Sequence, residues 1–196
     1  MMNLANKLTM LRIFLVPLFL IFIAVKNIPY GTFIATFIFI IASLTDQLDG
    51  YIARSRNQVT TFGKFLDPLA DKILVLTAMV LLVELGKIPA WIPIIVIFRE
   101  FAVSGYRLIA VQNSGKVIAA NVWGKLKTVT QMIAIILMFL TTQPYFAFVN
   151  SELIYMTTGD FVMNILASIF MTISVIATIF SGYEYLKGGK DLLKDC

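Results

Sequence analysis

The 196-residue sequence contains no histidine and a single cysteine, which is its last residue, Cys196. Without a second cysteine the chain forms no internal disulfide, and without histidine it lacks the commonest zinc ligand and general base. Charged residues are also scarce, at 14% of the chain. Any chemistry must therefore depend on a few carboxylates, lysines, arginines and hydroxyls, or on metal ions that these groups bind.

Apolar residues make up most of the sequence. The chain is 59% hydrophobic, with a mean hydropathy of +0.88, which is far from the composition of a soluble domain. We therefore expect an integral membrane protein. Its net charge of +5 then reports on membrane topology, and we expect no nucleic-acid partner.

Six apolar runs have the length of about 20 residues that crosses a membrane core of ~30 Å. They cover residues 8–25, 32–54, 66–85, 90–111, 120–142 and 160–186. Glycine, proline and asparagine mark the breaks between them, and no signal-peptide cleavage site follows the first run. We predict an all-α integral membrane protein with six transmembrane helices, forming one domain over residues 1–196.

Basic residues predict the orientation of these helices. Most of the 16 lysines and arginines lie near the two termini or in the loops at 55–65 and 112–119, whereas the opposite loops hold only Lys26 and Lys87. Because cytoplasmic loops carry the excess of basic residues, both termini should be cytoplasmic. The protein should then be a multi-pass component of the cell (inner) membrane.

Four aspartates interrupt the second and third apolar runs. They are Asp46, Asp49, Asp67 and Asp71. A carboxylate at the bilayer centre costs about 2.5–3.5 kcal/mol, so the group must face water, the interface or cations. Helical spacing places the first two acids on a stripe with Gly50 and Ala53, and the last two on one face with Gly63. Since a short loop joins the two helices, the four carboxylates should converge at their cytoplasmic ends.

A cluster of oxygen ligands suits hard divalent cations, and four carboxylates exceed what one Mg²⁺ usually takes from a protein. Two cations, Mg²⁺ or Mn²⁺, are the natural interpretation, and such pairs clamp phosphate groups during a displacement. The alternative is an interfacial network of ion pairs between the acids and nearby basic residues. Its members would be Arg54, Arg56, Lys64 and Lys72.

The same stretch resembles the signature of the CDP-alcohol phosphotransferases, Asp-x2-Asp-Gly-x2-Ala-Arg-x8-Gly-x3-Asp-x3-Asp. The matching residues are Asp46, Asp49, Gly50, Ala53, Arg54, Gly63, Asp67 and Asp71. The resemblance implies a membrane enzyme that moves a phosphatidyl-type group from a CDP-linked lipid to an alcohol and releases CMP. It also implies two divalent metals held by the four aspartates, with Asp71 as the base that deprotonates the acceptor hydroxyl.

The resemblance also extends to the start of the chain. Asn6, Thr9 and Arg12 match the Asn-x2-Thr-x2-Arg opening of many bacterial members, where these residues would help line the nucleotide site. The implied CDP-lipid site then comprises Asn6, Thr9, Arg12, Gly50, Ala53, Arg54 and Gly63. The alternative is a helix start with a capping side chain and an arginine that snorkels to the interface.

Basic residues in the fourth and fifth runs bear on the acceptor. They are Arg99 and Arg107, with Glu100 beside them, followed by Lys125 and Lys127. Positive groups near an acidic metal site favour a phosphate-bearing acceptor. The pattern resembles the family branch that makes phosphatidylglycerophosphate, which implies sn-glycerol 3-phosphate held by Arg107 and Lys125 with the other three nearby. A structural Arg99–Glu100 pair and a topology-marking Lys127 are the alternatives.

The sequence thus predicts CDP-diacylglycerol, sn-glycerol 3-phosphate and membrane lipid as partners, and the family resemblance implies a homodimer. Other acceptors stay open, namely inositol phosphate, serine or phosphatidylglycerol. A cation transporter is an alternative from another class, although the acids gather toward one face rather than at the membrane midplane. A non-enzymatic scaffold leaves the cost of four acids unexplained.

Overall fold

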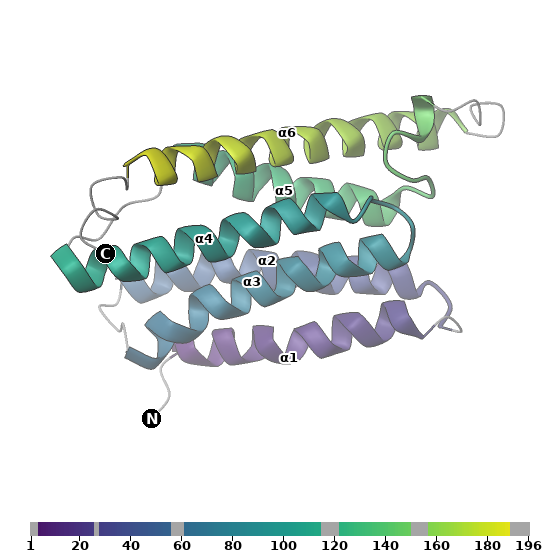
Figure 1. The fold of residues 1–196 in the computed structure, drawn as a ribbon. Helices are drawn as coiled ribbons and strands as arrows, with labels where there is room; N and C mark the ends of the chain where they lie inside the picture. The colour runs from purple at the N-terminus through teal and green to yellow at the C-terminus, as the bar shows by residue number, and fades with distance from the viewer. Residues whose placement is uncertain (1–3, 26–27, 56–60, 115–121, 150–156, 189–196) are drawn as a thin grey trace.

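The computed structural model of the protein describes residues 4–25, 28–55, 61–114, 122–149 and 157–188, and within them every regular element is helical (Figure 1). The α-helices are α1 (Leu4–Ala24), α2 (Gly31–Ser55), α3 (Thr61–Glu84), α4 (Trp91–Ser114), α5 (Val122–Leu140) and α6 (Thr158–Gly188), with a short 3-10 helix, η1 (Ala147–Val149), before α6. The predicted all-α class is confirmed for the described residues.

Each predicted apolar run coincides with one helix, and the bounds differ mainly in α3. This helix begins at Thr61, five residues before the run that starts at residue 66. Hydropathy marks the part of a helix that suits lipid, whereas backbone hydrogen bonding continues through polar residues at its end. The first turn of α3, including Gly63, is therefore helical although it is not apolar.

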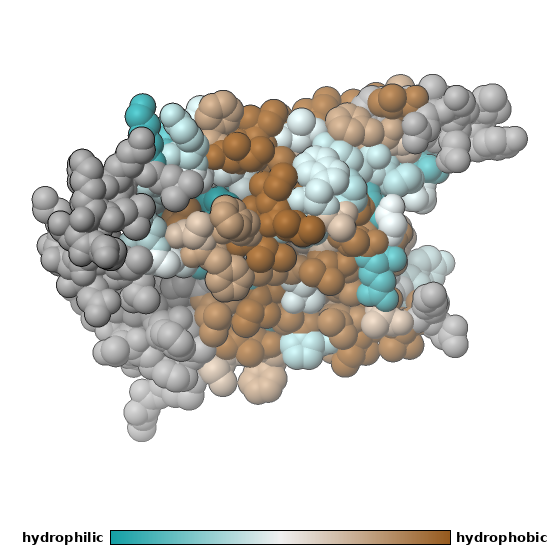
Figure 2. Space-filling view, in the orientation of Figure 1, coloured by the Kyte–Doolittle hydropathy of each residue, from teal (hydrophilic) through white to brown (hydrophobic). Residues whose placement is uncertain are grey.

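The surface of the bundle is apolar around its middle. Figure 2 shows a brown zone across the centre of the molecule. Large apolar side chains such as Phe14, Phe37 and Phe98 are exposed. Among the described residues, α5 and the segment Thr158–Tyr185 of α6 are long and apolar enough to cross a membrane. So broad an exposed apolar surface belongs in lipid rather than in water.

The helices run side by side, alternating in direction (Figure 1). Helix α5 packs against α6 and α2, α1 packs against α2 and α3, and α4 packs against α6 and α3. In the core, the ring of Phe19 lies 5.9 Å from that of Phe39 and 5.6 Å from that of Phe139, which joins α1, α2 and α5. Fully buried alanines such as Ala78 and Ala134 let neighbouring helices approach closely.

Because neighbouring helices alternate in direction, the helix termini gather at two ends of the bundle, which we call the site end and the distal end. The site end contains the starts of α1, α3 and α5 and the ends of α2, α4 and α6. The distal end contains the opposite helix termini (Figure 1). The predicted site residues of α1 and α5 lie toward the starts of these helices, and the four aspartates lie toward the end of α2 and the start of α3. Arg99 and Glu100 lie deeper in the bundle, in the first half of α4.

A lysine joins two helix connections at the distal end. Lys87, between α3 and α4, donates hydrogen bonds from Nζ to the carbonyl oxygens of Met138 (3.0 Å), Phe139 (3.1 Å) and Thr141 (2.6 Å). These carbonyls close α5, where the last turn of a helix lacks donors of its own. Burial lowers the pKa of the Lys87 ammonium from 10.5 to about 8.

The connection from α5 to α6 is also fixed by hydrogen bonds to its backbone. Asn164 Nδ2 donates to the carbonyl of Pro144 (2.8 Å), and the Phe146 amide donates to Ser168 Oγ (3.1 Å). The Asp160 amide donates to Thr157 Oγ1 (3.2 Å), which caps the first turn of α6. Polar side chains at the distal end therefore serve largely to satisfy main-chain groups.

Candidate functional site

The four aspartates lie on two helices that contact each other, α2 and α3, toward their termini at the site end. Asp46 and Asp49 belong to the last turns of α2, and Asp67 and Asp71 to the first turns of α3. Their side chains lie outside what the structure describes, so the metal site stays a prediction. Four carboxylates at helical spacings of three and four, on two contacting helices, form a donor set that fits hard divalent cations.

The other residues of the sequence signature share these two helices. Gly50, Ala53 and Arg54 belong to the end of α2, and Gly63 to the first turn of α3. The structure does not describe the side chains in these turns. Their contacts with a CDP-linked lipid stay a prediction.

Helix α1 carries the predicted nucleotide-site residues at its start. Thr9 and Arg12 are each only 1% exposed, whereas the side chain of Asn6 lies outside the described part. Arg12 is thus buried against the neighbouring helices rather than reaching the surface as a snorkelling arginine would. Because α1 packs on both α2 and α3, a buried guanidinium here lies among the helices that carry the aspartates.

A group of polar side chains from four helices meets around Glu100, and we call it the Glu100 cluster. Its members are Lys72 of α3, Arg99, Glu100 and Ser104 of α4, Lys127 of α5 and Ser181 of α6. Glu100 Oε1 accepts hydrogen bonds from Arg99 Nη1 (3.0 Å) and from Lys127 Nζ. Lys72 Nζ lies 3.9 Å from Glu100 Oε2 and donates to Ser104 Oγ.

Counted over the side chains that the structure describes, the Glu100 cluster contains more positive than negative charge. Three cations surround one carboxylate, and the side chains are 27% exposed for Lys72, 12% for Arg99 and 5% for Lys127. The Arg99–Glu100 pair considered from sequence is present, but it is one part of a larger group. Lys127 is buried and ion-paired, which a lysine that only marks topology would not be. An unbalanced positive site in a region of low dielectric attracts anions.

Arg107 lies about two turns beyond Arg99 on α4. Its Nη2 donates to the hydroxyl of Tyr185, and its guanidinium carbon lies 5.2 Å from the centre of the Tyr185 ring. Arg99 approaches the same ring at 5.8 Å. Tyr185 of α6 is buried, and because its ring contacts both guanidinium groups it links the two arginines. Sequence reasoning missed this tyrosine, although its position four residues after Ser181 places both on one face of α6.

Lys125 takes a different direction from Lys127. Its side chain is exposed, and the structure does not bring it into the Glu100 cluster. Residues two apart on a helix point about 200° apart around its axis, so neighbouring lysines on α5 cannot serve the same contact. A shared role of Lys125 and Arg107 in holding a phosphate stays a prediction.

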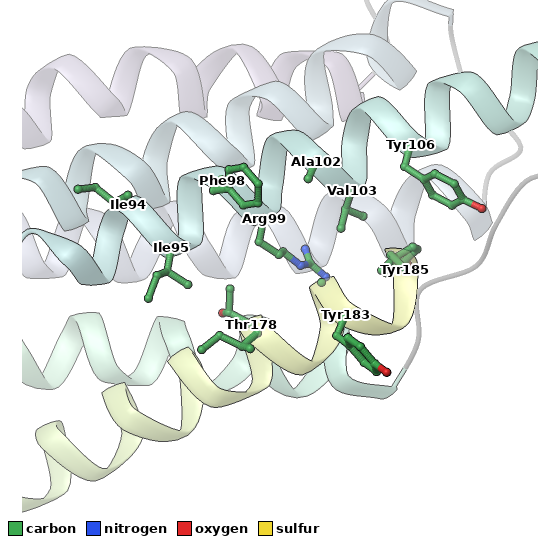
Figure 3. Close-up of a pocket in the computed structure, with 12 residues that line it drawn as sticks. Ile94, Ile95, Phe98, Arg99, Ala102, Val103, Tyr106, Thr178, Tyr183 and Tyr185 are labelled. Atoms are coloured by element: carbon green, nitrogen blue, oxygen red, sulfur yellow. The ribbon is translucent and has the colours of Figure 1, made fainter. Parts of the chain in front are cut away.

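An apolar groove of about 440 Å³ lies between α4 and α6, next to the Glu100 cluster (Figure 3). Ile94 and Phe98 line its α4 side, and Thr178 and Tyr183 its α6 side. Figure 3 shows Arg99 extending from α4 toward α6 along the wall. Phe98 and Tyr183 are mostly exposed, so the groove opens to the outside and suits apolar chains.

A protein-family model described as CDP-alcohol phosphatidyltransferase matches residues 2–180 of the chain. The match covers both helices that carry the aspartates and the members of the Glu100 cluster on α3, α4 and α5, and it ends one residue before Ser181 of α6. It agrees with the resemblance drawn from the signature between Asp46 and Asp71.

Curated relatives match over almost the whole length. A CDP-diacylglycerol–glycerol-3-phosphate 3-phosphatidyltransferase of Bacillus subtilis is 40% identical, covering 99% of this chain and 98% of the relative. A protein of the same name from Haemophilus influenzae is 38% identical, covering 98% and 96%. A probable phosphatidylglycerophosphate synthase of Mycobacterium tuberculosis is 34% identical, covering 94% of this chain and 80% of the relative.

Proposed function

Because the chain belongs to the CDP-alcohol phosphatidyltransferase family, we propose that it converts CDP-diacylglycerol and sn-glycerol 3-phosphate to phosphatidylglycerophosphate and CMP. The observation that carries the proposal is the near full-length similarity to relatives with this activity in their names. The excess of positive charge in the Glu100 cluster supports an acceptor that bears a phosphate.

In the proposed reaction Asp46, Asp49, Asp67 and Asp71 hold the metals. Two divalent cations, Mg²⁺ or Mn²⁺, supply when bound the positive charge that neutralises the diphosphate of the lipid substrate. Asp71 accepts the proton of the acceptor hydroxyl, and the acceptor oxygen then attacks the phosphorus on the lipid side. The bond from this phosphorus to the CMP oxygen breaks, and CMP leaves with the electron pair. A carboxylate base fits a chain without histidine.

The CDP end of the lipid is proposed to lie between the start of α1 and the aspartate helices. The near-complete burial of Thr9 and Arg12 supports this placement, since a buried guanidinium suits recognition of a phosphate. Asn6 belongs to the same helix start, and Arg54 to the end of α2. Small residues at Gly50, Ala53 and Gly63 would let the nucleotide approach the helix backbones.

The phosphate of sn-glycerol 3-phosphate is proposed to bind Arg107 and Lys125. Glu100 orients its basic neighbours, as the contacts of Arg99 and Lys127 with its carboxylate support. Arg99 and Lys127 add positive potential from within the bundle, while Arg107 keeps donors beyond the one used on Tyr185.

We also propose that the six helices span the membrane with both termini and the site end in the cytoplasm, and that the protein is a homodimer in the cell (inner) membrane. The exposed apolar surface around the middle of the bundle and the distribution of basic residues along the chain support this topology. The site end then meets its water-soluble acceptor from the cytoplasm while the lipid substrate arrives within the membrane.

The test is CMP release by the purified chain in detergent, with CDP-diacylglycerol and a panel of acceptors. We expect turnover with sn-glycerol 3-phosphate, little with serine or inositol phosphate, and loss of activity when EDTA removes divalent cations. Preference for serine would overturn the proposed acceptor. Metal-dependent ion flux into vesicles without turnover of the CDP-lipid would indicate a transporter instead.

A further inference from the structure

We propose that Lys72 is a further contact for the phosphate of the acceptor, held in place by Ser104 and Glu100. The inference rests on the proposed function and assigns a role to a residue outside the acceptor set of Arg99, Glu100, Arg107, Lys125 and Lys127. Lys72 follows Asp71 directly on α3, yet its ammonium contacts α4. It is therefore the basic residue that links the aspartate helix to the Glu100 cluster.

The hydrogen bonds of the Glu100 cluster leave Lys72 with donors to spare. An ammonium has three N–H donors, and among the described residues that of Lys72 donates only to Ser104 Oγ. Its distance of 3.9 Å to Glu100 Oε2 is beyond hydrogen-bond range, so this contact is electrostatic. Glu100 Oε1, in contrast, is occupied by Arg99 and Lys127.

Exposure also separates Lys72 from the other cations. At 27% its side chain is the most accessible of the three around Glu100, compared with 12% for Arg99 and 5% for Lys127. Arg99 is also engaged with Ser181 and lies near the ring of Tyr185. Lys127 and Arg99 thus neutralise the carboxylate, and Lys72 is the cation that a soluble anion can reach.

The place of Lys72 on α3 gives such a contact a chemical use. An acceptor phosphate held by Lys72 would lie beside the helix that carries Asp71, the proposed base. Fixing the phosphate restricts where the acceptor hydroxyl can lie, and this orientation lowers the barrier of a bimolecular step. Lysine ammonium groups are common point-charge contacts for phosphate. An acceptor without a phosphate would gain nothing from this residue.

The experiment compares Lys72→Gln with the wild-type chain in detergent, measuring KM separately for sn-glycerol 3-phosphate and CDP-diacylglycerol. Loss of a charge-assisted hydrogen bond should raise the acceptor KM roughly 10- to 100-fold and change the lipid KM less than about twofold. Lys72→Arg should recover part of the acceptor affinity. Ser104→Ala, which removes only the supporting hydroxyl, should shift the acceptor KM in the same direction by less.

The matched control is Lys187→Gln, since Lys187 is an exposed lysine in the last turn of α6 at the same end of the bundle. It removes the same charge and should leave both KM values unchanged. As a second readout, inorganic phosphate should compete with sn-glycerol 3-phosphate, and Lys72→Gln should weaken that inhibition in parallel. Size-exclusion chromatography and thermal unfolding report whether each variant is folded.

An unchanged acceptor KM in folded Lys72→Gln would overturn the inference, as would equal increases in both KM values. It would also be overturned if Lys187→Gln raised the acceptor KM as much as Lys72→Gln does. In those cases the wild-type enzyme still turns over sn-glycerol 3-phosphate, so the proposed function stands. A wild-type chain inactive with this acceptor would instead overturn the proposed function. If Lys72→Gln does not fold, Lys72→Arg and Ser104→Ala decide the question by the same comparison of KM values.

Discussion

The two ends of the bundle use lysine in opposite ways. At the distal end, Lys87 donates to three main-chain carbonyls at the end of α5, where the helix dipole also favours positive charge. In the Glu100 cluster, Lys72 and Lys127 meet other side chains, and with Arg99 they outnumber the single carboxylate. The distal lysine is satisfied by the fold, whereas the cluster keeps positive charge that a ligand can use.

This difference predicts which substitutions affect folding and which affect chemistry. Polar groups that satisfy the backbone contribute to stability, because their removal leaves buried carbonyls without donors. Charges in excess of what the fold neutralises reduce stability and are retained where they serve binding or catalysis. Substitutions at the distal end should therefore lower the melting temperature, and substitutions toward the site end should change kinetic constants.

The largest effect is expected from Asp71→Asn. The amide cannot accept the proton of the acceptor hydroxyl, so turnover should fall by at least about 10²-fold. The chain should still fold, since Asn is nearly isosteric with Asp and removes a charge that is costly in the bundle. CMP release measures the rate, and thermal unfolding in detergent checks the fold. Full activity in this variant would remove Asp71 as the base.

A smaller and more selective effect is expected from Arg107→Ala. Loss of a guanidinium that binds phosphate should raise KM for sn-glycerol 3-phosphate by roughly 10-fold or more, with little change in KM for CDP-diacylglycerol. Because Arg107 also contacts Tyr185, the variant Tyr185→Phe is a useful control that removes one hydrogen bond and keeps the ring. Equal changes in both KM values for Arg107→Ala would argue against an acceptor-phosphate contact.

The smallest kinetic effect is expected from Lys87→Met at the distal end. The substitution removes three hydrogen bonds to the end of α5, each with a net contribution of about 0.5–1.5 kcal/mol, so the melting temperature should fall by several degrees. Both KM values should stay within about twofold of wild type. A large change in KM with an unchanged melting temperature would contradict the division between the two ends.

The pH dependence of the melting temperature, compared between wild type and Lys87→Met, tests the burial of the Lys87 ammonium. Burial lowers the pKa of Lys87 to about 8 in the folded protein, below its ordinary value of 10.5. The folded state therefore disfavours the charged form, and this penalty is fully present below pH 8 and is relieved as the pH rises toward 10.5. The melting temperature of wild type relative to Lys87→Met should rise between pH 7.5 and about 9.5. A constant difference over this range would show that the ammonium is not significantly desolvated.

The helices could be predicted from sequence because long apolar runs leave few other structures in a membrane. The signature from Asp46 to Asp71 predicted the family, which the comparisons confirm. The partners of individual cations could not be predicted. That Lys127 points inward to Glu100 while Lys125 is exposed depends on how α5 rotates against its neighbours, which helical periodicity alone does not fix.

Polar residues with ordinary apolar neighbours were also missed. Tyr185 and Ser181 lie in a helix that reads as a lipid-spanning segment, and their role follows only from the packing of α6 against α4. Lys72 was considered from sequence only as an ion-pair partner of the aspartates, because a serine and a lysine 32 residues apart become neighbours only when α3 and α4 pack together. Charge and hydropathy indicated where polar residues gather, but packing decided which of them meet.

The position of Arg99 next to Glu100 has a consequence for how the protein is made. Helix α4 leaves the ribosome before α5 and α6, so at that stage neither Lys127 nor Ser181 is in place to contact it. Glu100 would then be a bare carboxylate entering lipid, except that the adjacent Arg99 already provides a countercharge at 3.0 Å. The pair would let the nascent helix insert with its charges matched, and α5 and α6 later add Lys127 and Ser181 to a pair that is kept in the folded protein.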